Sequence, residues 1–196
     1  MTRQRDTRSR MVRSAVAVLR ERGSGGVTID SVLARSGAPR GSVYHHFPGG
    51  RAQIVSEALS FAGDAISELI ERNAGEGYSG ALHRFVDLWR NLLEGSSYTA
   101  GCPVVAVAVG PTEDDPALFA EAGAILDRWR TVIAERIVQE GLPAATAQRL
   151  STMSIAAVEG AVIMCRAQRS MEPLDEVVEQ LEVLFDSHGL RARITR

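Results

Sequence analysis

The chain has 196 residues, of which 45% are hydrophobic and 23% are charged. This balance is typical of a soluble globular protein with a sizeable core, and it excludes disorder as the main state. The length suits one larger helical unit or two small domains and excludes a large multidomain enzyme. No apolar run reaches the roughly 18 residues that span a bilayer, and residues 1–10 are basic without a signal-type apolar stretch, so we expect a cytoplasmic protein with no membrane partner.

Charge is distributed unevenly along the chain. Residues 1–55 contain ten arginines and three acidic residues, a formal charge of +7, whereas the remainder contains twelve arginines and 21 acidic residues, a formal charge of −9. A basic end on an acidic body predicts that this end meets a polyanion. The arginines between residues 3 and 22 are expected to belong in part, about half of them, to an ordinary solvated face.

The first third of the chain reads as short helices with clear boundaries. Apolar residues at three- and four-residue spacing predict a helix over residues 7–22, ended by the glycine-rich residues 23–26. Thr28 is expected to cap a short helix through Ala34, because its hydroxyl can accept from an amide two or three residues on. Ser36-Gly37-Ala38 then forms a tight turn, and Pro39 opens another short helix that ends near Phe47.

The rest of the chain predicts longer helices. The stretch over residues 102–109 suits a strand or a buried helix by its length, and we interpret it as a helix from its context. Asp115 and Pro116 form a cap and first-turn pair at the start of one long helix. The long helices are predicted over residues 51–73, 81–94, 115–141, 144–170 and 173–187.

Residues 28–47 have the pattern of a helix-turn-helix, in which the second helix enters the major groove of DNA. Val43 and Phe47 are four residues apart and are expected to pack this helix onto the first one. The residues left to face outward include an arginine that can form two hydrogen bonds to guanine, a glycine that allows close approach to DNA and a serine hydroxyl. Two further side chains have rings that can donate hydrogen bonds. The outward-facing residues are Arg40, Gly41, Ser42, Tyr44 and His45.

Other interpretations of these residues stay open. Tyr44 could instead lie over the helix at residues 7–22. A metal site at His45 and His46 is not expected, since consecutive helical residues point about 100° apart. Cys102 and Cys165 form no CxxC pair, so we predict neither a disulfide nor a zinc site; small core residues are favoured over redox sensors.

The stretch from Ala38 to Arg51, above all Ser42-Val43-Tyr44-His45-His46-Phe47, resembles the DNA-binding domain of the TetR family of bacterial repressors. With residues 101–108 it is similar to the subgroup of lincomycin- and flavonoid-responsive repressors of drug-efflux genes. The resemblance implies an all-α fold, with an N-terminal three-helix helix-turn-helix domain (residues 1–50) joined by a long helix to a larger helical ligand-binding and dimerisation domain (residues 51–196). It also implies a homodimer formed by the last two long helices and a ligand cavity in the body.

The expected partners are a palindromic operator duplex, a second copy of the chain and a small apolar or amphipathic effector. The residues expected to contact DNA are Thr28, Arg40, Gly41, Ser42, Tyr44, His45, His46 and Arg51. Aromatic, Met and Cys side chains could line the ligand cavity, although plain core is the commoner role for such stripes. The candidates are Phe85, Trp89, Cys102, Phe119, Trp129, Met153 and Met164. Glu159, in an apolar stretch, is expected to form a bundle salt bridge or to turn toward solvent.

Three functions compete. The favoured one is a ligand-responsive transcriptional repressor, controlling efflux or detoxification genes. The second is a constitutive DNA-binding regulator without an effector. The third, a helical enzyme, has little support because the chain carries no GxSxG, HExxH, GxxxxGK[ST] or GxGxxG motif, so no catalytic residue and no cofactor are predicted. For an effector, the body favours aromatic or amphipathic molecules, neutral or cationic, over phosphorylated ones.

Overall fold

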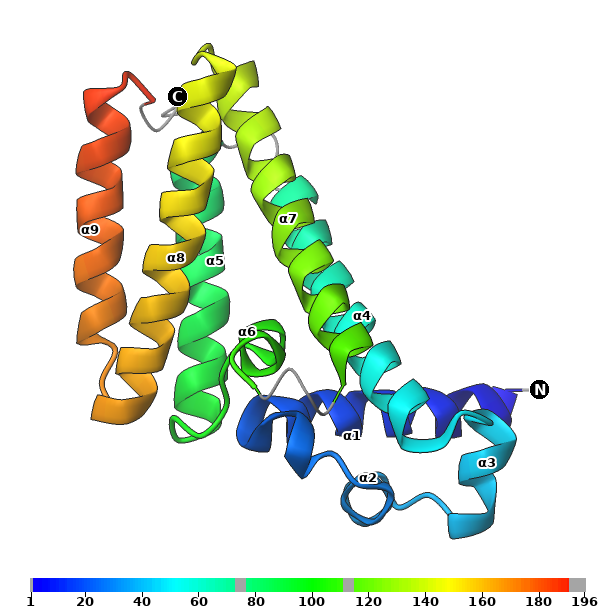
Figure 1. The fold of residues 1–196 in the computed structure, drawn as a ribbon. Helices are drawn as coiled ribbons and strands as arrows, with labels where there is room; N and C mark the ends of the chain where they lie inside the picture. Colours follow the sequence, from blue (N-terminus) through cyan, green and yellow to red (C-terminus); the bar gives the residue numbers. More distant parts are fainter. Residues whose placement is uncertain (1, 73–76, 111–114, 191–196) are drawn as a thin grey trace. The chain divides into compact units, whose positions relative to one another are not determined.

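The structure is a computed structural model that describes residues 2–72, 77–110 and 115–190. Over these residues it is built from helices and contains no strand (Figure 1). The chain divides into two compact units. Unit 1 comprises residues 1–64 with residues 102–125, and unit 2 comprises residues 65–101 with residues 126–196. Unit 1 thus extends beyond residue 50, and the division at residue 50 stays a prediction about the DNA-binding domain.

Unit 1 contains the helices of the expected DNA-binding motif. It consists of α1 (Thr2–Gly26), α2 (Ile29–Ser36), the 3-10 turn η1 (Arg40–Ser42), α3 (Val43–His46), the first part of α4 (Gly50–Arg72), α6 (Pro103–Ala108) and the start of α7 (Pro116–Gln139). The ambiguous stretch at residues 102–109 is a helix, as predicted, and it packs against α1. Its Pro103, Val104 and Val107 are buried, whereas Val109 just after the helix is 74% exposed, so burial accounts for part of this apolar stretch.

The helix α1 is longer than the predicted range of residues 7–22. It continues through Gly26 across a break at Gly23, whose φ of 69° lies in the left-handed region that glycine adopts without strain. Met11, Ala15 and Leu19 of α1 are fully buried, so the predicted periodicity does mark the core face. The first part of α4 contributes Leu59 to the same core.

Unit 2 is a bundle made of the end of α4, α5 (Gly77–Gly95), the second part of α7, α8 (Ala144–Gln168) and α9 (Glu172–Ser187). The helices α8 and α9 lie side by side, and α5 packs against both (Figure 1). By length and composition alone, α8 could cross a membrane. It buries nine of its residues in the protein, as the core helix of a soluble bundle does.

Candidate DNA-reading surface and ligand cavity

The first helix of the motif, α2, is capped at both ends by local bonds. The Thr28 hydroxyl accepts from the Ser31 amide at 3.0 Å, and the Ser31 hydroxyl accepts from the Thr28 amide at 2.9 Å. This reciprocal capping box satisfies two amides that the helix itself leaves unbonded. At the other end Gly37 is left-handed, with φ of 65°, and its amide donates to the Leu33 carbonyl. The predicted cap and the predicted turn are both confirmed.

The second helix of the motif begins after Pro39 as the turn η1 and continues as α3. Val43 is 1% exposed and Phe47 is fully buried, so the predicted packing pair is confirmed. Tyr44 is 64% exposed, which favours the outward orientation over packing onto α1. Arg40 faces solvent and forms an ion pair with Asp30 of α2 at 2.7 Å, with both side chains exposed. Because an exposed pair of this kind contributes little stability, Arg40 is available to exchange this partner for another.

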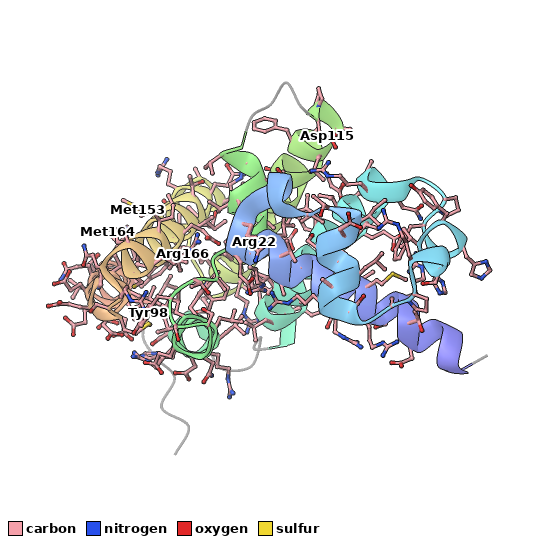
Figure 2. All side chains as sticks on the ribbon, turned by 90° about the horizontal axis from the view of Figure 1, so that it is seen from below. Arg22, Tyr98, Asp115, Met153, Met164 and Arg166 are labelled. Carbon is pink, nitrogen blue, oxygen red and sulfur yellow. The ribbon has the colours of Figure 1, made fainter. Side chains whose placement is uncertain are left out.

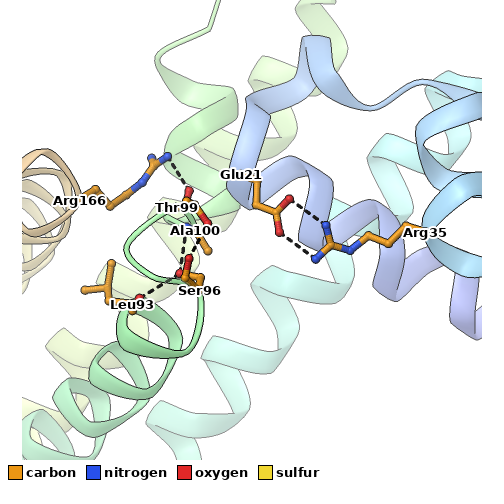
Figure 3. A network of polar contacts seen from close by, with 7 residues as sticks. All are labelled: Glu21, Arg35, Leu93, Ser96, Thr99, Ala100 and Arg166. Carbon is orange, nitrogen blue, oxygen red and sulfur yellow. Dashed lines mark hydrogen bonds and ion pairs between the residues drawn. The ribbon is translucent and has the colours of Figure 1, made fainter. Parts of the chain in front are cut away.

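Two ion pairs hold the motif within unit 1. Arg35 of α2 makes a two-pronged pair with Glu21 of α1, with both N···O distances at 2.8 Å (Figure 3). Arg8 of α1 bonds to Glu57 of α4 and lies 5.1 Å from the centre of the Phe47 ring. The two-pronged geometry of the Arg35–Glu21 pair fixes the orientation of the two side chains better than a single bond does. The Arg35 pair therefore fixes α2 on α1, and Arg8 lies against the end of the second helix while its ion pair joins α1 to α4.

His45 and His46 stand at the exposed end of α3, with ring centres 5.1 Å apart. Partial burial, followed by the nearby charges of His45 and Arg8, holds the pKa of His46 below its usual value. A neutral His46 ring can both donate and accept a hydrogen bond, whereas the protonated ring only donates.

Arg51, expected to contact DNA, bonds to the protein itself. Its Nε donates to the Val27 carbonyl and its Nη2 to the Ser24 carbonyl, each at 2.7 Å. The guanidinium therefore joins the first turn of α4 to the segment between α1 and α2. Sequence reasoning could not find these bonds, because the partners lie 24 and 27 residues away. Whether Arg51 also reaches DNA stays a prediction.

Unit 2 contains a cavity of about 70 Å³. Most of its lining is aliphatic and comes from α4, α5, α7 and α8. Its aromatic and polar members are Phe85, Trp129, Arg136, Ser154 and Glu159. The aliphatic wall contributed by α4 consists of Ile66, Leu69 and Ile70. An apolar space with a few polar groups is the usual form of a small-molecule site.

Of the seven residues proposed to line a cavity, Phe85 and Trp129 do so. Trp89 is buried next to Phe85, and their rings meet edge to face with centres 6.2 Å apart. Trp89 itself is not among the residues that line the cavity. Cys102 and Phe119 belong to unit 1, so the structure does not bring them to this cavity.

Met153 and Met164 lie on the exposed side of α8 (Figure 2), with 54% and 47% of their surfaces exposed. Both are outside the cavity lining. Because they are 11 residues apart, they lie on one face of the helix, about 20° apart around its axis. Their exposure and shared face suit an interface with another chain better than a ligand site.

Two charged residues of the lining were not expected there. Glu159 is 7% exposed, so the interpretation that it turns toward solvent is wrong. Arg136 continues the stripe of Trp129 and Ile133 at helical spacing, and its Nε is buried without a hydrogen-bond partner. The sequence did contain a signal for Arg136, because it is a charged residue on a helix face whose neighbouring members, Trp129 and Ile133, are apolar.

A second polar group in unit 2 ties α8 to the segment that follows α5. Arg166 donates to the Thr99 carbonyl at 2.9 Å (Figure 3). The Ser96 hydroxyl accepts from the Ala100 amide at 3.1 Å. A Cβ at Gly101 would lie 2.7 Å from the guanidinium of Arg166, so a larger residue there would make this flexible side chain shift.

Comparison with known proteins identifies both halves of the chain. Residues 12–58 match the family described as bacterial regulatory proteins, tetR family, and residues 79–180 match the C-terminal domain described as transcriptional regulator LmrA/YxaF-like. An HTH-type transcriptional regulator of Mycobacterium tuberculosis is 40% identical over 183 residues, which cover 91% of this chain and 93% of that protein. LmrA of Bacillus subtilis, also an HTH-type transcriptional regulator, is 25% identical over 86% of this chain and 91% of its own.

Solved structures agree with these matches. A TetR transcriptional regulator from Chloroflexus aurantiacus has a TM-score of 0.74 at 25% identity, covering 95% of this chain and 97% of that one. A regulator from Legionella pneumophila shares the fold, with a TM-score of 0.79 at 16% identity over 89% of this chain and 95% of that one. These relatives are transcriptional regulators and not enzymes. A family that acts on DNA implies a cytoplasmic protein.

Proposed function

Because the chain belongs to the TetR family of bacterial transcriptional regulators, we propose that it is a repressor whose affinity for operator DNA is controlled by a small molecule bound in unit 2. The observation that carries this proposal is the continuity of α4. This helix runs unbroken from Gly50 to Arg72. Its first turn is bonded to the helix-turn-helix through Arg51, and its later residues Ile66, Leu69 and Ile70 line the cavity.

The contacts of α4 with α7 support the same proposal. The hydroxyls of Ser56 and Ser60 both donate to the carboxylate of Glu121, at 2.8 and 2.5 Å. One turn further on, a Cβ at Gly63 would lie 2.9 Å from the Ile125 side chain, so the two helices are in close contact. Both helices then continue into the cavity wall. A ligand that displaces either wall is expected to turn both helices about this fixed contact.

The DNA-facing part of the proposal is a dimer that presents two copies of α3 to a palindromic duplex. Two such heads read half-sites about 34–36 Å apart, one turn of duplex, so a modest tilt of α4 moves both out of register. We propose that Arg40, Gly41, Ser42, Tyr44, His45 and His46 face the groove, with Thr28 at the phosphates. Arg40 and Tyr44 have the exposure that this requires.

The proposed dimer interface is the outer face of α8 together with α9. Met153, Gly160 and Met164 share one face of α8, and Val183 of α9 is 62% exposed. An exposed apolar face with a glycine in it suits close packing against its own two-fold copy. We propose efflux or detoxification genes as targets, supported by the apolar character of the cavity.

The test is the affinity for a labelled duplex from the region upstream of the gene itself, measured by fluorescence anisotropy. Aromatic and amphipathic compounds are first screened for binding by quenching of the two tryptophans. A compound that binds in unit 2 is expected to weaken DNA binding, and by reciprocity DNA weakens its binding by the same factor. Compounds that bind without changing DNA affinity would leave a constitutive DNA-binding regulator, the alternative function.

A further inference from the structure

We propose that the effector is a small, uncharged and mostly apolar molecule that presents one acceptor oxygen to the buried Nε–H of Arg136. This inference rests on the proposed function and specifies the chemistry of its ligand. It depends on three properties of the cavity in unit 2: its apolar lining, the state of its polar groups and the balance of its charges.

The lining of the cavity favours a small apolar ligand, and its size requires the walls to move. The cavity measures about 70 Å³, whereas an apolar cavity that binds benzene measures about 150 Å³, so a ring-sized ligand must push the lining side chains apart. An apolar enclosure lacks hydrogen-bond partners for water, and an apolar molecule that enters it leaves water behind. Trp129 and Phe85 contribute aromatic side chains to the lining.

Arg136 offers a donor that the protein does not use. Its Nη1 donates to Gln139 at 3.2 Å, which leaves the guanidinium anchored at its outer end. Its Nε is buried and has no hydrogen-bond partner. A buried donor without an acceptor is unfavourable and rare in folded proteins. A ligand oxygen beside Nε would remove this cost, and it would gain a bond to a group that carries charge at any physiological pH.

The other polar groups of the lining favour an uncharged ligand. The Ser154 hydroxyl donates to the Leu150 carbonyl at 2.8 Å, so its hydrogen is already used. Glu159 adds a carboxyl group to the lining that already holds the Arg136 guanidinium. An anionic ligand would meet Glu159, and a cationic ligand would meet Arg136. A neutral carbonyl, ether or phenol oxygen avoids both repulsions and still accepts from Nε.

The test compares two probes of matched shape. Acetophenone has a carbonyl oxygen where isopropylbenzene has a methyl group, and the two are otherwise alike in size. Binding is measured without DNA, by calorimetry and tryptophan fluorescence, on the full-length protein. The variants are Arg136→Met, Arg136→Lys, which keeps the charge but removes the Nε donor, and Arg149→Met as a matched control. Arg149 is exposed on α8 and lies outside the cavity lining.

We expect the ratio of acetophenone affinity to isopropylbenzene affinity to fall about tenfold or more in both Arg136 variants, the value of one hydrogen bond to a charged donor. The control should keep the ratio of the unsubstituted protein. Equal weakening of both probes would overturn the proposal, because Arg136 would then only shape the cavity. Tighter binding of 1-phenylethylamine than of acetophenone, lost in Glu159→Gln, would also overturn it in favour of a cationic ligand.

The same measurements distinguish a failure of this inference from a failure of the proposed ligand-controlled repression. A probe that binds through Arg136 but leaves DNA affinity unchanged supports this inference and counts against ligand-controlled repression. A compound that releases DNA with equal strength in Arg136→Met supports ligand-controlled repression and overturns this inference.

Discussion

Replacing Arg51 with methionine tests whether this residue acts on DNA directly or through the scaffold of the helix-turn-helix. The structure gives its guanidinium two hydrogen bonds to backbone carbonyls, at Ser24 and Val27. Methionine keeps much of the apolar stem but removes both donors. The change therefore detaches the first turn of α4 from the segment that precedes α2.

The expected magnitude follows from these two bonds. Hydrogen bonds to charged groups contribute about 1.5–3 kcal/mol each when buried, but Arg51 is exposed, so solvent screens them and we expect about 2 kcal/mol in total. For a protein of this length, that loss lowers Tm by roughly 4–8 °C. Arg40→Met is the matched control, because its exposed ion pair should contribute almost no stability.

The assay is the salt dependence of operator binding, followed by anisotropy between about 50 and 200 mM salt. If Arg51 acts through the scaffold, its loss lowers affinity and Tm but leaves the slope of log K against log salt unchanged. If it contacts a phosphate, the slope of the dimer becomes shallower by about 2, since each lost contact removes about 0.9. A shallower slope with an unchanged Tm would refute the positioning role.

Four other substitutions test the remaining parts of the proposal. Arg40→Ala should cost on the order of 1–3 kcal/mol of DNA binding and relax specificity at one base pair per half-site; uniform loss across all duplexes would assign Arg40 to a phosphate. His46 has a lowered pKa in the folded state, so its contribution to stability is complete above its unfolded value near 6.5 and declines as the pH falls below it. Calorimetry between pH 7 and 5 should therefore show a smaller fall of Tm in His46→Gln, and an identical fall would contradict the assignment. Gly160→Leu should yield a folded monomer in sedimentation, because a Cβ there meets no atom within 4 Å of its own chain; a mutant that remains dimeric would place the interface elsewhere. Glu121→Gln should weaken the link between ligand binding and DNA release while leaving ligand affinity unchanged, and unaltered release in anisotropy would remove the α4–α7 contact from the mechanism.

The fold could be predicted largely from local chemistry. Thr28 and Gly37 act within one helical turn, so their side-chain and backbone preferences alone located both ends of α2. The same is true of Asp115, whose carboxylate accepts from the Leu118 amide at 3.1 Å. The predicted end of the first helix is confirmed at Gly23, where the helical backbone breaks, but the whole glycine-rich run is not a stop. Only Gly23 breaks the helical backbone there, and helix resumes to Gly26.

The outward face of the DNA-reading helix could also be predicted, for the same reason. Val43 and Phe47 define its buried side at helical spacing, and the remaining positions must face away. The bonds of Arg51 could not be predicted. They depend on how α4 approaches the end of α1, which is a property of the assembled unit and not of either segment.

The cavity lining was the least predictable part of the structure. Apolar residues at helical spacing indicate that a side chain is buried, but they do not indicate whether it faces a cavity or the packed core. Trp89 and Trp129 are both at most 2% exposed and lie on comparable stripes, yet only Trp129 reaches the cavity wall. An apolar wall can be built from many side chains of similar volume, so its members carry little individual signal. A DNA-reading helix has no such freedom, since it meets phosphates and base edges whose chemistry is constant. The exceptions within a cavity are its charged residues, which are costly to bury without a purpose. Arg136 and Glu159 are therefore the positions of the lining on which the proposed ligand chemistry depends.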